Sequence, residues 1–328
     1  MGADAVVHLP VLAAMAPGFR TTLVAAAWIG GLVVVLVAVS IFGSGPWARR
    51  ASMLNRYVWL SALALVVLFP IYVTIVNSLL RADLIAARPP TLFPTDPQWG
   101  TYADAWSEGH FGRYLFNTAL VTTLTVVAQV VTSVFAAYAF AYLEFPLKRT
   151  LFVTFLATMM VPLEVTFLTN VQTVADVRSV PILGPLAGYD TYGALVVPFL
   201  ATGFGAFLVR QSFMALPRDL RDAAALDGYG HWRFMLRVAV PLSRPTIAAL
   251  SLFSFFGAWN QYLWPLLVTK DDRLRTVQIG LRQLSRVSID RFNVTFAGTV
   301  LAVLPLLILL IVFQKQLVRG LTAGAVKG

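Results

Sequence analysis

The sequence has no cysteine and few charged residues. Without cysteine, disulfide bonds, thiolate catalysis and cysteine-ligated metals are excluded. Charged residues make up 12% of the 328 residues, whereas soluble globular domains carry about 25%. Hydrophobic residues make up 58% of the chain. This composition excludes an ordinary cytoplasmic enzyme and indicates a protein that crosses a membrane several times.

Histidines and enzymatic motifs are scarce as well. With only His8, His110 and His231 in the chain, no histidine metal cluster is expected, and His110 and His231 are interpreted as surface residues. No phosphate loop of the form GxxxxGK[ST] occurs, since none of the four lysines follows a glycine. The HExxH and GxSxG patterns are absent too. We therefore expect this chain to hold no catalytic residue, no metal and no cofactor.

Long apolar runs predict the membrane spans. A helix of about 20 apolar residues crosses the hydrocarbon core. The first run is longer than the roughly 7 to 15 residues of a secretory signal, and Arg49, Arg50 and Arg56 follow it, so we expect it to be retained. The prediction is an all-α polytopic bundle of about seven transmembrane helices, one N-terminal helix added to a core of six, at 22–43, 57–79, 114–140, 150–171, 191–209, 246–268 and 294–314.

The charges predict the orientation of these spans. The formal net charge of +10 would suggest nucleic acid in a soluble chain, but in a membrane protein basic residues mark cytoplasmic loops. Four segments, 43–56, 141–149, 210–245 and the tail from 315, hold 14 basic and 4 acidic residues, which leaves 11 of each for the other side. The C-terminus is therefore predicted in the cytoplasm and the N-terminus outside. The loop Lys270–Arg291, with six basic residues, is the weakest point of this assignment.

One cytoplasmic segment, residues 210–245, is too charged to cross a membrane and too regular for a slack loop. Pro217 suits the first position of a helix, where its missing N–H costs nothing. Gly228 can take the left-handed conformation that ends a helix. A second apolar helix is predicted from Trp232 up to Pro241. The segment is thus predicted to be two short helices joined by a glycine turn.

This pattern closely resembles the EAA signature of importer-type ABC transporter permeases, with an Asp in place of the usual Glu and Val238 and Val240 in place of Ile and Leu. In that family the segment is the coupling helix, which docks in a groove of the cytoplasmic ATPase. An amphipathic helix resting on the lipid headgroups is the alternative. The resemblance assigns coupling to the ATPase to Asp222, Ala223, Ala224, Asp227, Gly228 and Pro241.

Three further stretches resemble the carbohydrate branch of that family, specifically the second permease of maltose-type importers. They are LEFPLKR at 143–149, FFGAWNQYLWPLL at 255–267 and FQKQLVRGLTAGAVKG at 313–328. The similarity covers residues 57–328. It implies a permease domain there, including the coupling loop and a cytoplasmic tail at 315–328, and leaves residues 1–56 as an extra transmembrane helix with a basic cytoplasmic connector.

The resemblance implies function, location and partners. The chain would be a non-enzymatic permease subunit in the bacterial inner membrane that moves an oligosaccharide, sugar or polyol by alternating access. The partners would be a homologous permease, two ATPase subunits that bind ATP and Mg²⁺, an extracellular or periplasmic solute-binding protein and membrane lipid, but no nucleic acid. A glycerol-phosphate permease is the alternative, followed by an ATP-independent carrier or channel.

The resemblance also places the C-terminal tail against the ATPase dimer, with an unstructured terminus as the alternative. The small residues there suit an extended segment that enters a crowded groove. The tail residues assigned to this contact are Gly320, Leu321, Thr322 and Gly324.

Polar residues inside the spans are candidates for the translocation pathway, because polar groups in a membrane face a partner, the bundle interior or water. Amides can donate to and accept from sugar hydroxyls, and aromatic rings can stack on sugar faces. The alternatives are a helix contact for the amides, an aromatic belt for the rings and a structural bond for the glutamate. The candidates are Asn260, Gln261, Glu164, Trp259 and Tyr262.

The outer loop from Lys270 to Asn293 holds five arginines. These arginines could contact acidic patches of a solute-binding protein, or they could simply be exposed to solvent.

Overall fold

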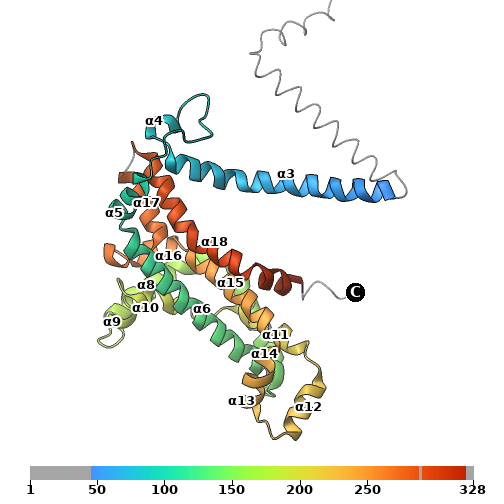
Figure 1. Ribbon diagram of the computed structural model, residues 1–328. Helices are drawn as coiled ribbons and strands as arrows, with labels where there is room; N and C mark the ends of the chain where they lie inside the picture. The colour runs from blue at the N-terminus through green and yellow to red at the C-terminus, as the bar shows by residue number, and fades with distance from the viewer. Residues whose placement is uncertain (1–45, 288–289, 323–328) are drawn as a thin grey trace, which may run out of the picture. The chain divides into compact units, whose positions relative to one another are not determined.

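The computed structural model describes residues 46–287 and 290–322, and side chains in 52–162, 165–286 and 290–314 (Figure 1). The described residues form helices joined by turns and contain no β-strand, which confirms the all-α prediction. The helices are α3 (Pro46–Leu79), α4 (Ala82–Ile85), α5 (Gly100–Glu108), α6 (Phe111–Tyr142), α7 (Lys148–Ala157), η1 (Thr158–Met160), α8 (Leu163–Arg178), α9 (Gly184–Ala187), α10 (Tyr192–Val196), η2 (Val197–Phe199), α11 (Gly203–Met214), α12 (Arg218–Leu226), α13 (His231–Phe234), η3 (Met235–Ala239), α14 (Val240–Leu242), α15 (Arg244–Trp259), α16 (Leu263–Val268), η4 (Asp272–Leu274), α17 (Val277–Val287) and α18 (Phe292–Thr322).

Three helices are long and apolar enough to cross a membrane: Ser52–Leu79, Phe111–Tyr142 and Phe292–Gln314. Three bent helix pairs raise the count to six if each pair is one span. The three long helices and the first two bent pairs match five of the seven predicted spans. The third pair, His231–Leu242 with Arg244–Trp259, overlaps the predicted span 246–268 only through α15 and begins inside the predicted cytoplasmic segment. The remaining predicted span, 22–43, lies outside the described residues.

Two predicted spans, 150–171 and 191–209, are bent rather than straight, and a third bend lies just before the predicted span 246–268. The pair around Pro162 turns by 99°, the pair around Leu200 by 46°, and the pair that meets at Ser243 by 77°. Proline removes an intrahelical hydrogen bond and clashes with the preceding turn, which accounts for the break at Pro162. At the third bend Pro245 is the second residue of α15, in the first turn, where its missing N–H costs nothing. The predicted helix 246–268 also ends at Trp259, and α16 begins only at Leu263.

The described residues divide into two units, with the boundary between Val73 and Thr74. In the first unit the helix begins at Pro46, so the described part of the predicted basic connector, 46–56, is helical and not a loop. In the second unit α6 is the central element, and it packs most extensively against α11 and α15 (Figure 1).

Small residues let α11 approach α6 closely. Gly205 and Ala206 are buried on α11, and a Cβ built on Gly205 would overlap the hydroxyl oxygen of Ser133 on α6. Small residues serve the same purpose between helices in membrane proteins generally. Residues of α6 also take part in all three buried hydrophobic clusters of the unit. A rigid movement of α6 would therefore shift its contacts in all three clusters.

The second unit is tied together by polar contacts at the Phe111 end of α6. Asn117, which is 1% exposed, donates from Nδ2 to the carbonyls of Arg273 and Arg275 at 2.8 and 2.9 Å and accepts from Tyr192. Arg291 binds both Asp104 and Glu108 on α5. Partial burial lowers the pKa of Arg291, but the two carboxylates outweigh this effect and raise it. Arg291 is therefore held as a cation between α5 and α18.

Candidate functional site

The glycine turn predicted at Gly228 is present in a stretch, residues 217–242, that we name the coupling segment. Gly228 has a φ of +74°, the left-handed region that glycine adopts without strain. The N–H of Tyr229 donates to the carbonyl of Ala224 at 2.8 Å, and that of Gly228 to Ala225 at 3.0 Å. These two hydrogen bonds form a Schellman motif, which ends α12 sharply.

Two details of the coupling segment differ from the prediction. Pro217 is the N-cap of α12 rather than its first helical residue, because its ψ of 136° is extended. The second helix does not stop at Pro241 but continues to Leu242, and a π-helical turn over Met235–Ala239 precedes the proline. Proline clashes with the carbonyl four residues before it, and a π-turn at Arg237 widens the helix where that carbonyl lies.

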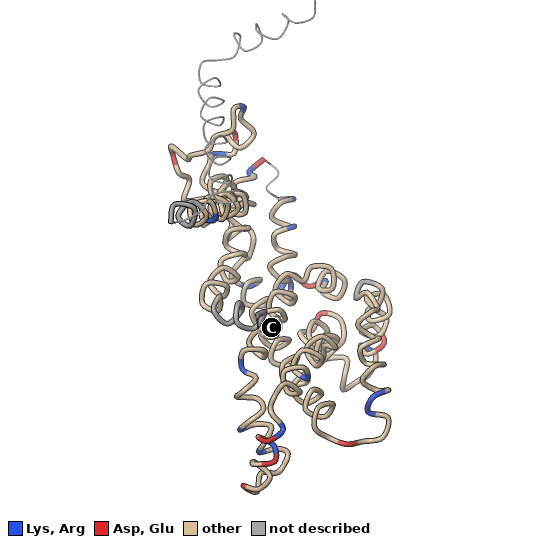
Figure 2. Tube along the Cα trace, turned by 90° about the vertical axis from the view of Figure 1, so that its right-hand side faces the viewer, with Lys and Arg blue, Asp and Glu red and all other residues tan. Residues whose placement is uncertain are grey.

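The side chains of α12 divide into a packed and an open set. Ala224 is buried and packs with Leu216 and Tyr229 in a cluster that includes α6 and α11. Leu226, one residue before the cap of α12, is 91% exposed. Asp222, Ala223 and Asp227 are exposed as well. In Figure 2 the charged residues of this region gather at one end of the second unit. The open set is thus a surface of charged and small residues in which Leu226 is the most exposed apolar side chain.

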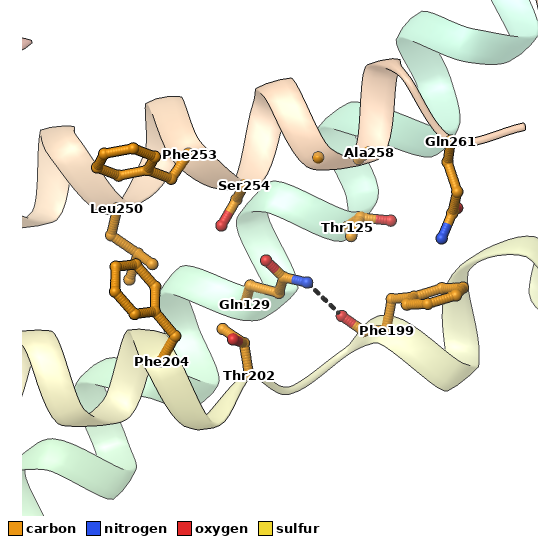
Figure 3. A pocket seen from close by; sticks show the side chains of 11 residues that line it. Thr125, Gln129, Phe199, Thr202, Phe204, Leu250, Phe253, Ser254, Ala258 and Gln261 are labelled. Carbon is orange, nitrogen blue, oxygen red and sulfur yellow. Dashed lines mark hydrogen bonds between the residues drawn. The ribbon is translucent and has the colours of Figure 1, made fainter. Parts of the chain in front are cut away.

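A cavity of about 220 Å³ lies between α6, α15 and the link from η2 to α11 (Figure 3). Its wall combines hydroxyl and amide groups with three phenylalanine rings. Gln129 on α6 donates from Nε2 to the carbonyl of Phe199 at 2.9 Å, and Thr132 donates to the carbonyl of Leu200 at 2.9 Å. These bonds satisfy carbonyls that the break between η2 and α11 exposes. The lining residues are Thr125, Gln129, Phe199, Thr202, Phe204, Leu250, Phe253, Ser254, Gly257, Ala258 and Gln261.

The two amides predicted to line the pathway, Asn260 and Gln261, occupy different environments. Gln261 lines the cavity. Asn260 instead caps α15: its Nδ2 donates to the carbonyl of Phe256 at 3.0 Å, and its Oδ1 accepts from Gln278. Because α15 ends at Trp259 and α16 begins only at Leu263, both amides lie in the link between the two helices, where the chain turns and directs them to different sides.

The two aromatic pathway candidates do not line this cavity. Trp259 is 3% exposed and stacked on Phe255, and its indole N–H donates to the carbonyl of Ala302 on α18. The prediction that its ring receives a sugar is therefore wrong, because neither face is accessible. The ring of Tyr262 lies against the guanidinium of Arg282 at 5.5 Å. Glu164 lies on α8, but its side chain is outside the described residues, so its role stays a prediction.

Sequence reasoning missed four polar residues of the cavity: Thr125, Gln129, Thr202 and Ser254. A signal existed for one of them, since Gln129 is an amide inside the apolar run 114–140 and the rule applied to Asn260 covers it equally. The hydroxyls carry no comparable signal, because Ser and Thr can bond back to the carbonyl four residues earlier and lie anywhere on a helix.

The tail and the outer loop are partly described. Gly320, Leu321 and Thr322 continue α18, so the tail is helical at its start rather than extended, and Gly324 lies outside the described residues. In the outer loop Arg275 pairs with Asp272 at 2.5 Å, and Arg291 pairs with the two carboxylates of α5. Two of the five loop arginines are thus already paired inside the chain, while Arg273, Arg282 and Arg286 are exposed.

Comparison with known proteins supports the resemblance. The family model described as "Binding-protein-dependent transport system inner membrane component" matches residues 129–323. The sn-glycerol-3-phosphate transport system permease protein UgpE of Pectobacterium atrosepticum is 34% identical over 281 residues, which are 83% of this chain and 97% of that protein. UgpE of Rhizobium meliloti is 34% identical over 282 residues, again 83% and 97%.

Two solved structures share the fold. A chain from the crystal structure of a bacterial ABC transporter involved in the import of the acidic polysaccharide alginate superposes with a TM-score of 0.70 at 20% identity, over 83% of this chain and 98% of that one. A chain of the bacterial alginate ABC transporter in complex with an alginate pentasaccharide-bound periplasmic protein gives 0.56 at 14% identity, over 80% and 93%. The chain belongs to the family of inner membrane components of binding-protein-dependent transport systems.

Proposed function

We propose that this chain is one permease subunit of an ATP-driven importer that brings a neutral carbohydrate or polyol across the bacterial cytoplasmic membrane. The observation that carries the solute class is the chemistry of the cavity wall. In the described part of the chain every residue that lines the cavity is uncharged. Amides and hydroxyls match sugar hydroxyls as donors and acceptors, and phenylalanine rings match the apolar faces of a sugar.

A second candidate solute is glycerol 3-phosphate, which the curated relatives are named for. The wall of the cavity argues against it. A phosphate carries about −1.5 to −2 charges at neutral pH, and burying it without a cationic partner is costly. The source of positive potential at this wall is the N-terminus of α11, where Thr202 is the N-cap, and a helix N-terminus is equivalent to only about half a charge.

The assembly follows from the family. A homologous permease would complete the pathway, two cytoplasmic ATPase subunits would bind ATP and Mg²⁺, and a solute-binding protein would deliver the solute from outside. The open set of α12, with Leu226 at 91% exposure, is the surface offered to the ATPase. The coupling segment and the C-terminus would then lie in the cytoplasm, and the N-terminus outside.

In the proposed cycle, closure of the two ATPase subunits on ATP moves the coupling segment, and the two permeases switch from inward to outward access. This chain contributes a lever of fixed angle, because the Schellman motif sets how α12 leaves the turn. It also contributes a neutral wall on which a polyhydroxylated solute exchanges water for hydroxyl and amide groups.

Purification through a tag on this chain, followed by reconstitution in proteoliposomes, tests the proposal. We expect a second permease and an ATPase to co-purify. ATP should drive uptake of a labelled neutral sugar such as maltose, or a polyol from a matched panel, in preference to labelled glycerol 3-phosphate. ATP-driven uptake of glycerol 3-phosphate alone would overturn the solute class and leave the importer in place. Transport by this chain without an ATPase would overturn the importer.

A further inference from the structure

A single face of α6 holds the coupling segment. Phe135, Tyr138 and Tyr142 lie three and four residues apart, which places them on one side of a helix. The ring of Phe135 stacks on Trp232, with centroids 5.7 Å apart and planes at 18°. The ring of Tyr142 meets Phe234 edge-on at 5.4 Å. Between these two contacts Tyr138 faces His231.

The contact between Tyr138 and His231 differs in kind from its neighbours. The hydroxyl of Tyr138 and Nδ1 of His231 are 3.0 Å apart and share a hydrogen bond, and the ring planes are at 83°. Tyr138 is 6% exposed. Ring stacking depends mainly on contact area, whereas a hydrogen bond weakens steeply when its angle or length changes. The hydrogen bond therefore fixes the register between α6 and the coupling segment more tightly than the stacked rings do.

The position of His231 suits a link. It is the first residue of α13 and follows the turn at 228–230. A movement of α12 therefore reaches the rest of the segment at His231. A cavity of about 180 Å³ beside it is lined by Arg221 and Tyr229 among others. This space leaves α12 room to move relative to α6, while the hydrogen bond between His231 and Tyr138 keeps the start of α13 bound to α6.

The other end of the link is the neutral cavity. Gln129 lies nine residues before Tyr138 on the same helix, which is about 13 Å at 1.5 Å per residue. Gln129 and Thr132 bind the carbonyls of Phe199 and Leu200 at the break before α11. One continuous helix thus joins a hydrogen bond to the coupling segment with two hydrogen bonds at the cavity wall.

We propose that the Tyr138–His231 hydrogen bond makes α6 move with the coupling segment, so that His231 is a positioning residue for transport. This inference rests on the proposed function, since it assumes that an ATPase moves the coupling segment. It gives a role to a histidine that the sequence assigns only to the surface. Movement at His231 reaches the wall formed by Gln129 through α6 as a rigid body.

The test uses the assembled importer and a reporter that needs no known solute. Because this chain has no cysteine, Ser254→Cys places a single thiol in the wall of the cavity. The rate at which a maleimide labels it is measured with and without ATP and vanadate. In the otherwise unchanged chain we expect trapping of ATP to change this rate.

Tyr138→Phe keeps the ring and removes the hydroxyl. We expect the ATPase to co-purify and to hydrolyse ATP as before, while the ATP-dependent change in labelling rate falls about fivefold, which corresponds to the roughly 1 kcal/mol of one net hydrogen bond. His231→Ala should do the same, and the double variant should add nothing further. His231→Asn should restore the response, since its amide can both donate and accept at the position of Nδ1.

Tyr142→Phe is the matched control. It removes a hydroxyl from the next turn of α6, but that hydroxyl donates to the carbonyl of Phe213 on α11 and not to the coupling segment. We expect it to lower thermal stability and leave the labelling response intact. The proposal is overturned if Tyr138→Phe keeps the full response, or if Tyr142→Phe loses as much. A reporter that ignores ATP in the otherwise unchanged complex would instead overturn alternating access at this cavity, and the link with it.

Discussion

The angle of the coupling segment depends on one glycine, and Gly228→Ala measures that dependence. A Cβ at Gly228 meets nothing within 4 Å, so the substitution creates no clash. Its whole cost is the backbone conformation at φ +74°, which a residue with a Cβ adopts at a cost of about 1–2 kcal/mol. A cost of this size lowers the population of the correctly turned segment by a factor of roughly 5 to 30.

Gly230 supplies a matched control two residues later. A Cβ there also meets nothing within 4 Å, but Gly230 has a φ of −73°, which alanine adopts freely. We expect Gly230→Ala to behave as the unchanged protein, while Gly228→Ala lowers uptake per ATP hydrolysed. Gly228→Asn should fall between them, because asparagine tolerates the left-handed region better than alanine does.

The assay is ATP-driven uptake and ATP hydrolysis measured together in proteoliposomes of the complete importer. The expected result is that the ratio of uptake to hydrolysis falls for Gly228→Ala and not for Gly230→Ala. The reasoning from backbone geometry is refuted if both alanine variants transport normally, or if Gly230→Ala is the more damaging of the two.

Three further substitutions test other parts of the account. Gly257→Phe places a ring in open space at the cavity wall. It should lower uptake at least about tenfold, the effect of about 1.4 kcal/mol, and leave thermal unfolding unchanged. Normal uptake would mean that the solute passes elsewhere. Gly205→Val should lower the free energy of unfolding by about 1–3 kcal/mol, because its Cβ would overlap the hydroxyl oxygen of Ser133. An unchanged melting temperature in detergent would contradict this close packing. Asn117→Leu removes two hydrogen bonds to the carbonyls of the 273–275 turn and should destabilise by about 1–3 kcal/mol, seen as faster proteolysis of that turn; unchanged proteolysis would count against it.

Much of the fold follows from the sequence because a bilayer restricts the options. Every backbone group inside the hydrocarbon must be satisfied within the chain, so an apolar run of sufficient length becomes a helix. That rule predicts the three long apolar helices and the bent pairs around Pro162 and Leu200. It does not predict their bends, which depend on what satisfies the freed backbone groups. At the break around Leu200, Gln129 on a helix far away in sequence donates to the carbonyl of Phe199, and the hydroxyl of Thr132 lies within hydrogen-bond distance of the carbonyl of Leu200.

The coupling segment was predictable for a local reason. Its turn depends on Gly228 and the residues directly around it, and the Schellman motif needs no partner from elsewhere in the chain. The π-turn before Pro241 was not predicted, although its cause is also local, because proline at this position can either end a helix or distort it. Which of the two occurs depends on the packing of Phe234, Met235 and Ala239 in the core.

The pathway was the hardest part to predict. Trp259 and Gln261 lie two residues apart, yet one is enclosed by α18 and the other lines the cavity. The end of α15 at Trp259 separates them, and the sequence pattern does not show where the helix ends or which side of it faces a neighbouring helix. That information comes from tertiary packing of α15 against α18, which a single sequence does not display.

A photo-crosslink shows whether the coupling segment docks on an ATPase. Leu226→Cys, at a position that is 91% exposed on α12, carries the crosslinker in a chain without other cysteines. Ile308→Cys, at 60% exposure on α18, is the control within a membrane span. The account predicts that the first crosslinks to the ATPase and that the second does not. A crosslink from both positions, or from neither, would contradict it.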